Sequence, residues 1–196
     1  MASDLLRFDK GTGQLFLKGA DGSQQVVVPL PATNKTVFIL IDASGSMSGK
    51  KFDNAKKGAL DFGLACLNKK YQVGVVVFSS ISAATSPTRD DATFHSNVNN
   101  LECTSRGTRL ASALKFTVNH KPAYVLVVTD GQVTDARQSL DEAARLKHDG
   151  TEILTIGTDD ADRAFLQQLA SRSDLGIKVA SDDLAQAISD AGRLLR

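Results

Sequence analysis

The chain has 196 residues, a length that fits one α/β domain and leaves little room for a second independent core. With 42% hydrophobic and 23% charged residues, the composition is globular and excludes the disordered and fibrous classes. Lysine and arginine number 23 against 22 aspartate and glutamate, which excludes a global basic field for nucleic acid or an anionic membrane, and the apolar runs are too short to span a bilayer.

The first predicted element is a β-hairpin. Residues 14–18 and 24–28 flank the turn-rich residues 19–23, which contain two glycines and an aspartate. We therefore expect residues 1–31 to form an N-terminal hairpin appendage and residues 32–196 to form the main domain.

Short, nearly continuous apolar runs at residues 36–41, 73–78, 124–128 and 153–156 predict strands of a parallel sheet that is covered on both faces. A weaker strand is predicted at residues 82–88, and a sixth strand at residues 176–180. Helical periodicity appears in the segments between the strands, on the residue sets Phe52, Ala55, Ala59, Phe62 and Cys66; Leu110, Ala113, Leu114 and Thr117; Leu140, Ala143 and Ala144; and Leu184, Ala187, Ile188, Ala191 and Leu195. A further helix is predicted at residues 161–171. Strand and helix in alternation predict right-handed βαβ units and a doubly wound α/β sheet.

Polar side chains follow the first main strand. Asp42, Ser44 and Ser46 alternate on a short loop at its carboxyl end, where open α/β sheets bind ligands. Capping of the next helix is the plainer explanation of this loop. The glycine and lysine of residues 45–50 do not make a phosphate loop, because three residues separate the glycines where four are needed.

A second carboxylate follows the strand at residues 124–128. Asp130 leaves that strand in a Thr-Asp-Gly turn, and it converges with Asp42 if the two strands are neighbours. Two facing carboxylates repel each other unless a cation lies between them. Carboxylates and hydroxyls form an all-oxygen site that suits Mg²⁺, with Mn²⁺ or Ca²⁺ as alternatives.

Here the chain resembles the von Willebrand A family. The family's DxSxS motif matches Asp42, Ser44 and Ser46, its threonine after glycine matches Thr108, and its later aspartate matches Asp130. The resemblance implies a Rossmann-like six-stranded sheet in the order 3-2-1-4-5-6, with one antiparallel edge strand and helices on both faces. It also implies a metal-ion-dependent adhesion site of the bacterial or cytoplasmic type. Metal contact would be direct from the three hydroxyls and partly through water from the two aspartates.

The resemblance implies a binding module, with no catalytic residues, in which an Asp or Glu of a protein partner coordinates the metal. We expect a monomer that binds neither nucleic acid nor membrane. One alternative is a Mg²⁺-dependent phosphohydrolase of the haloacid-dehalogenase type, but that chemistry wants an aspartate where Ser44 stands, and no lysine or histidine has an obvious catalytic relation to the loop. A subunit of an ATPase-associated or stress-response complex is another.

The remaining polar residues have plainer explanations. Lys50, Lys51, Lys56 and Lys57 are predicted to lie on solvated helix faces, and Asp159, Asp160 and Asp162 to start a helix, with the rim of the metal face as the alternative. Cys66 is predicted to be a small core residue, and Cys103 has no adjacent base that would make it a nucleophile. Two cysteines and the absence of a signal peptide pattern in residues 1–4 predict a reduced, cytoplasmic setting, while a single disulfide and a removed leader stay open.

Overall fold

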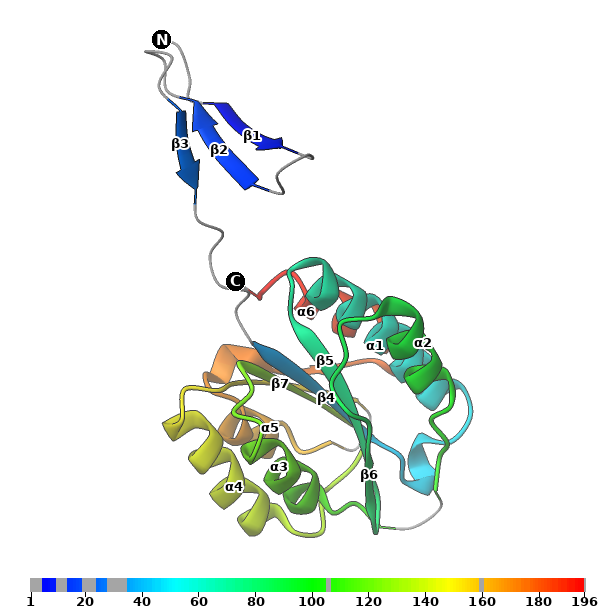
Figure 1. Ribbon diagram of the computed structural model, residues 1–196. Coiled ribbons are helices and arrows are strands. Elements are labelled where there is room, and N and C mark those ends of the chain that lie inside the picture. The colour runs from blue at the N-terminus through cyan, green and yellow to red at the C-terminus, as the bar shows by residue number, and fades with distance from the viewer. Residues whose placement is uncertain are drawn as a thin grey trace. The chain divides into compact units, whose positions relative to one another are not determined.

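The computed structural model describes residues 5–9, 14–18, 24–27, 35–104, 107–158 and 161–195 (Figure 1). The chain divides into two compact units, Met1–Thr33 and Asn34–Arg196.

The N-terminal unit contains a three-stranded antiparallel sheet. Its strands are β1 (Leu5–Asp9), β2 (Gln14–Lys18) and β3 (Gln24–Val27), in the order β1-β2-β3. Phe16 in β2 lies opposite Arg7 on one side and Val26 on the other. The strand β1 was not among the predicted elements.

The second unit is built on a six-stranded sheet in the order β6-β5-β4-β7-β8-β9. Five strands are parallel, and β6 pairs antiparallel with β5 at one edge. This is the order 3-2-1-4-5-6 implied by the family resemblance, and it confirms that expectation. The strand bounds are β4 (Thr36–Asp42), β5 (Gln72–Phe78), β6 (Ser82–Ala84), β7 (Tyr124–Thr129), β8 (Glu152–Thr158) and β9 (Gly176–Val179).

Helices cover both faces of this sheet (Figure 1). The helices α1 (Lys50–Asn68), α2 (Asp91–Asn99) and α6 (Leu184–Ala191) lie on one face. The helices α3 (Leu110–Val118), α4 (Ala136–His148) and α5 (Arg163–Leu169) lie on the other. Three short 3-10 helices, Gly45–Met47, Ser173–Leu175 and Ser181–Asp183, complete the elements of the described chain.

The central strand β4 shows why the sequence lacks polar alternation. All seven of its residues are buried, because its two faces contribute to two different cores. Val37, Ile39 and Ile41 pack with α1, α2 and α6. Phe38 and Leu40 pack with α3, α4 and α5. The strand therefore fixes both helix layers, and Asp42 at its end is placed on a rigid support.

Two elements of this unit differ from the sequence prediction. The helix α2 was not predicted, and its only buried residues are Phe94 and Val98, one turn apart. The strand β6 was predicted over residues 82–88 but ends at Ala84. After it, the Thr85 hydroxyl takes the place of a backbone acceptor for the Val75 N–H, and Pro87 interrupts the ladder before Thr88 bridges to Val73.

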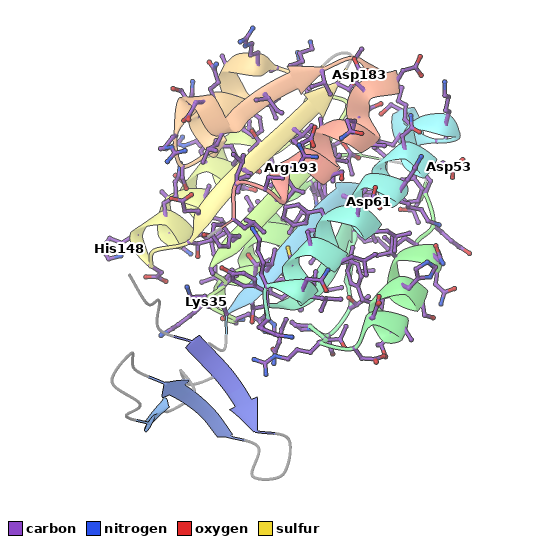
Figure 2. All side chains as sticks on the ribbon, turned by 90° about the horizontal axis from the view of Figure 1, so that it is seen from above. Lys35, Asp53, Asp61, His148, Asp183 and Arg193 are labelled. Carbon is purple, nitrogen blue, oxygen red and sulfur yellow. The ribbon has the colours of Figure 1, made fainter. Side chains whose placement is uncertain are left out.

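Charged side chains lie around the outside of the domain (Figure 2). The labelled residues come from helices and loops, and all of them are exposed: Lys35, Asp53, Asp61, His148, Asp183 and Arg193. Among the described helices, none has the length and apolar character that crossing a membrane requires.

Candidate metal centre

The predicted site residues gather where β4 and β7 end side by side. Ile41 lies opposite Val128 in the parallel register, so Asp42 and Thr129 are the next residues along the two strands. The Thr129 hydroxyl donates to Asp42 Oδ2 at 2.6 Å. Chain connections leave β4 and β7 towards opposite sides of the sheet, which makes this edge the topological switch point where α/β sheets bind ligands.

Asp42 is fully buried, and both of its carboxylate oxygens have donors. Oδ1 accepts the Ser44 N–H at 2.9 Å, and Oδ2 accepts the Thr129 hydroxyl. Burial raises the pKa of Asp42 above its usual range, the hydrogen bonds from Ser44 and Thr129 oppose that rise, and the charge of Asp130 adds to it. A positive charge nearby would therefore favour the ionised form of this carboxyl group.

The loop that carries Ser44 and Ser46 connects the carboxylates of Asp42 and Asp130. Ser44 and Ser46 hydroxyls lie 3.1 Å apart, and Ser46 Oγ donates to Asp130 Oδ1 at 2.7 Å. The 3-10 helix Gly45–Met47 holds this geometry, because the Met47 side chain is fully buried and anchors the loop to the core. Asp42, Ser44, Ser46 and Asp130 thus form one continuous polar cluster.

Thr108 reaches the same edge on a different loop. Its carbonyl accepts the Thr134 N–H at 2.9 Å and the Thr134 hydroxyl at 3.1 Å, and the next residue, Arg109, donates its N–H to the Ser79 carbonyl at 2.8 Å. Gly107 has φ of +72°, a conformation that glycine adopts without strain. Within the described part of the chain, the Thr108 hydroxyl makes no hydrogen bond to Asp42, Ser44, Ser46 or Asp130. Arg106, which precedes Gly107, lies outside the described residues.

Lys51 belongs to the cluster, which corrects the prediction of a solvated lysine. Its Nζ donates to Asp130 Oδ2 at 2.8 Å, and its side chain is 29% exposed against 77% for that of Lys50. A lysine therefore does stand beside the loop of Asp42, Ser44 and Ser46. A phosphohydrolase was disfavoured partly because no such lysine was expected from the sequence, and that expectation was wrong. Lys56 is half-buried, and its Nζ donates to the Asn99 and Leu101 carbonyls.

Asp135 supports the site without having been predicted. Its carboxylate accepts the N–H groups of Leu110 and Ala111 at 3.0 and 3.1 Å and the Ser139 hydroxyl at 3.1 Å. It therefore caps α3, whose first turn follows Thr108 directly. Asp135 lies 25 and 24 residues after Leu110 and Ala111 in the chain, so no local sequence pattern indicates that it caps their helix.

The two cysteines are free thiols. Cys66 is fully buried in the core, as predicted, and burial raises its pKa to about 12. Cys103 Sγ donates to the Ser44 carbonyl at 3.0 Å, and burial together with the charges of Asp42 and Asp130 raises its pKa. The shifts of both pKa values favour the protonated thiol over the reactive thiolate.

The donor set fits a hard divalent cation. Two carboxylates with exposed fractions of 0% and 2% face one another through hydroxyl groups, and an ammonium already stands against one of them. Across the described residues, no three His, Cys, Asp or Glu side chains come together as a metal-binding group. The all-oxygen set of carboxylates and hydroxyls is thus unlike a zinc site of the cysteine and histidine type.

Asp162 starts a helix, as predicted. Its Oδ1 accepts the N–H groups of Ala164 and Phe165 at the start of α5. Asp159 and Asp160 lie outside the described residues.

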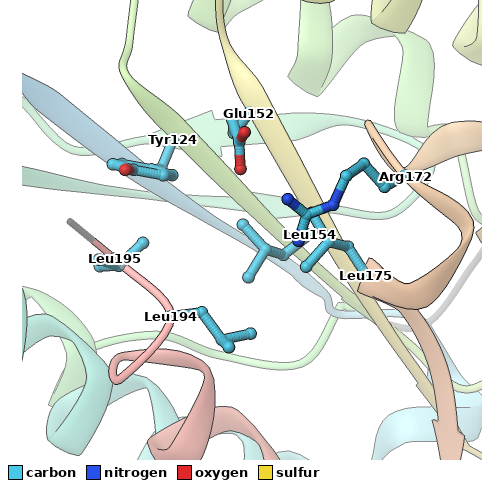
Figure 3. Close-up of a pocket in the computed structure, with 7 residues that line it drawn as sticks. All are labelled: Tyr124, Glu152, Leu154, Arg172, Leu175, Leu194 and Leu195. Carbon is cyan, nitrogen blue, oxygen red and sulfur yellow. The ribbon is translucent and has the colours of Figure 1, made fainter.

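A pocket of about 240 Å³ lies away from this cluster (Figure 3). Tyr124 and Glu152, which line it, are the first residues of β7 and β8. The pocket is therefore at the amino ends of the strands, the edge opposite the polar cluster. It contributes nothing to the candidate site.

Comparison with known proteins bears on the fold. A family model described as the von Willebrand factor type A domain matches residues 36–191. A von Willebrand factor A domain-containing protein of Dictyostelium discoideum is 30% identical over 132 residues, which covers 61% of this chain. The chain spans 14% of the length of that relative.

Solved structures share the fold at low sequence identity. The vWF domain of the type V pili tip protein Mfa5 from Porphyromonas gingivalis is 14% identical with a TM-score of 0.70, covering 86% of this chain and 96% of that one. Mussel byssus proximal thread matrix protein 1 with a zinc-occupied MIDAS motif is 18% identical with a TM-score of 0.65, covering 82% and 48%. Manganese-loaded TRAP protein of Plasmodium vivax is 15% identical with a TM-score of 0.60, covering 82% and 75%.

Proposed function

The chain belongs to the von Willebrand factor type A family, and on that premise we propose that it is a protein-binding module whose polar cluster is a metal-ion-dependent adhesion site. Domains of this family are typically metal-dependent adhesion or protein-binding modules and are generally not catalytic. The observation that carries the proposal is the pair of buried carboxylates, Asp42 and Asp130, linked through Ser44 and Ser46 at the end of two neighbouring strands.

Five side chains would hold the cation. Ser44, Ser46 and Thr108 would offer hydroxyl oxygens, and Asp42 and Asp130 would offer negative charge. We propose Mg²⁺ as the resident ion, with Mn²⁺ or Ca²⁺ as alternatives, because all five donors are oxygens. The zinc and manganese of the two structural neighbours support a divalent ion.

The proposed partner is a protein that presents an Asp or Glu. A bound divalent ion would supply an open coordination position for the carboxylate oxygen of that residue. The neutral hydroxyls add no negative charge that would repel it. Ile81, which is 70% exposed in the loop after β5, gives such a partner an apolar contact at the same edge. We also propose a monomer in a reducing, cytoplasmic setting, which the two free thiols support.

The phosphohydrolase alternative receives no support from the cluster. Its acid/base aspartate would have to stand two residues after Asp42, and Ser44 occupies that position with its hydroxyl against Ser46. Lys51 reaches Asp130, which follows β7 and is not the aspartate that this chemistry would use as the nucleophile. No residue of the cluster favours a role beside an ATPase or in a stress-response complex over any other partner.

Calorimetry with Mg²⁺ tests the metal site. We expect the wild-type protein to bind one ion, and Asp42→Ala and Asp130→Ala to lose at least about 100-fold in affinity, because each loses one of two carboxylates. Asp53→Ala, which removes an exposed carboxylate of α1 (Figure 2), is the matched control and should bind as wild type does. Circular dichroism would establish that each variant is folded. Unchanged affinity in both site variants would exclude this site.

Capture from lysate in Mg²⁺ and in EDTA tests the binding function. We expect one or more proteins to be retained by the wild-type chain in Mg²⁺ and released by EDTA, with none retained by Asp42→Ala. A partner held equally by both chains in EDTA would contradict the adhesion mechanism. With an aryl phosphate and Mg²⁺ we expect no turnover, and turnover that disappears in Asp42→Asn would instead establish the phosphohydrolase.

A further inference from the structure

The first turn of α1 carries two lysines in different surroundings. Lys50 reaches Asp182 at 2.6 Å, and both side chains are more than 75% exposed. Lys51 reaches Asp130 at 2.8 Å, where the Asp130 side chain is 1% exposed. Ion pairs at the surface are screened by water and salt, whereas a contact with a buried carboxylate is screened much less. The two lysines therefore differ in electrostatic importance although they are neighbours in the sequence.

The position of Lys51 is not explained by helix stability. Positive side chains in the first turn are disfavoured by the helix dipole, which suits negative charge there. The contact with Asp130 compensates, because Oδ1 of that carboxylate accepts the Ser46 hydroxyl while Oδ2 accepts the Lys51 ammonium. Lys51 therefore interacts favourably with the polar cluster and does not stabilise the helix dipole.

The charge of Lys51 changes the net charge of the polar cluster. Asp42 and Asp130 together carry about −2 when ionised, and Lys51 reduces this to about −1. A divalent ion bound in the same cluster would leave about +1, where the carboxylates alone would leave a neutral site. The same lysine that stabilises Asp130 in the absence of metal would then repel the metal.

We propose that Lys51 is a resident counter-cation: it neutralises Asp130 when no divalent ion is bound, lowers the affinity of the site for that ion, and leaves the loaded site positive towards an acidic partner. The competition with metal rests on the proposed metal site. The pairing with Asp130 in the metal-free protein does not depend on it.

Three variants test the proposal. Lys51→Met removes the charge but keeps a long side chain, Lys51→Arg keeps the charge, and Lys50→Met is the matched control, since it removes the adjacent lysine from the same helix turn. The difference between the two methionine variants cancels the effect of the helix dipole. Each variant is measured for Mg²⁺ affinity by calorimetry and for thermal unfolding in EDTA, with circular dichroism as the check on folding.

We expect Lys51→Met to bind Mg²⁺ roughly tenfold more tightly than Lys50→Met, because a neighbouring positive charge no longer opposes the ion. In EDTA it should unfold at a lower temperature than Lys50→Met, because the Asp130 carboxylate has lost its cationic partner and keeps only the Ser46 hydroxyl. Lys51→Arg should resemble the wild type in both measurements. In an Asp130→Asn background, substituting Lys51 should no longer lower the unfolding temperature below that of the matched Lys50 variant.

Different results would overturn the competition with Mg²⁺ and the pairing of Lys51 with Asp130. Equal or weaker Mg²⁺ binding by Lys51→Met would overturn the competition, and equal unfolding temperatures in EDTA would overturn the pairing. If neither the wild type nor any variant bound Mg²⁺, the proposed metal site and the competition would both be wrong, while the measurement in EDTA would still decide whether Lys51 neutralises Asp130.

Discussion

At the scale of single residues, Asp42 decides the electrostatics of the cluster. Its carboxylate has no contact with bulk water and relies on one N–H and one hydroxyl donor. These donors do not cancel the cost of burial, since the pKa of Asp42 remains raised. Ionisation of Asp42 is therefore unfavourable in the metal-free protein, a cost that a bound cation would offset.

Asp42→Asn should consequently stabilise the metal-free protein at neutral pH. Because the folded-state pKa of Asp42 is raised, the stability that it contributes is fully present below the ordinary value of 3.8 and is lost as pH rises through the folded-state value. The amide has no such loss and can still accept from Ser44 and donate to Thr129. Urea unfolding in EDTA should show the advantage of the variant growing from about pH 4 to neutral pH. An advantage that is constant with pH, or absent at neutral pH, would contradict this account.

The sequence predicted the residues of the cluster better than the contacts among them. The spacing of Asp42, Ser44 and Ser46 after an apolar strand indicates a ligand edge, because alternate residues of a loop can face one point. Nothing in the sequence separates Lys51 from Lys50, since both lie at the polar start of one helix and the distinction depends on where Asp130 is placed. Asp135 was missed for the same reason, because its partners are distant in the chain.

At the scale of elements, α1 and α2 approach each other closely at Gly63. A Cβ at this position would overlap the ring of Phe94, which is fully buried. Gly63→Ala should therefore lower the free energy of unfolding by about 1–3 kcal/mol, even though alanine is the better helix former. Addition of Phe94→Leu removes the overlapping ring atoms and should recover part of the loss. Urea denaturation of both variants measures this, and a stabilised single variant would show that α2 can move aside.

The cap of α3 gives a second prediction for an element. Asp135→Ala leaves the Leu110 and Ala111 N–H groups without their acceptor, and should cost about 1–2 kcal/mol of unfolding free energy. Asp141→Ala is the matched control, because it removes an exposed aspartate from α4 and should change stability by less than about 0.5 kcal/mol. Equal effects of the two substitutions in urea denaturation would mean that the cap contributes nothing.

Elements with long apolar runs or a full helical stripe were predictable, and short elements at the edges were not. The residues Phe52, Ala55, Ala59, Phe62 and Cys66 are all buried on one face of α1, as their spacing indicated. In α2 only two apolar residues face the core, and the helix start depends on Asp90, whose carboxylate accepts the Thr93 N–H at 2.7 Å. Two apolar positions are too few for periodicity to identify a helix.

At the scale of the whole unit Asn34–Arg196, the parallel order of the sheet brings the cluster together. Asp42, Thr108 and Asp130 are separated by long stretches of chain, yet they lie at one edge, where Asp42 ends β4, Thr108 precedes α3 and Asp130 follows β7. Backbone hydrogen bonds from Ala43 to Phe78, from Thr104 to Ala43 and from Thr134 to Thr108 tie these loops to one another. The order of the strands could be inferred from the family resemblance, whereas apolar runs alone do not determine it.

Because the cluster depends on loops from distant parts of this unit, metal should stabilise the unit as a whole. Unfolding separates Asp42 from Asp130, so the ion binds the folded chain and not the unfolded one. At Mg²⁺ concentrations about 100 times the dissociation constant, the free energy of unfolding should increase by about 2.7 kcal/mol. This corresponds to a rise of roughly 5–10 °C in Tm for a unit of this size. Calorimetric scans in Mg²⁺ and in EDTA measure the rise, with NaCl of equal ionic strength as the control for screening. Asp42→Ala and Asp130→Ala should show no rise, because neither retains the paired carboxylates. A wild-type Tm that is the same in saturating Mg²⁺ and in EDTA would mean that the ion does not bind the folded unit selectively, and the cluster would then not be its site.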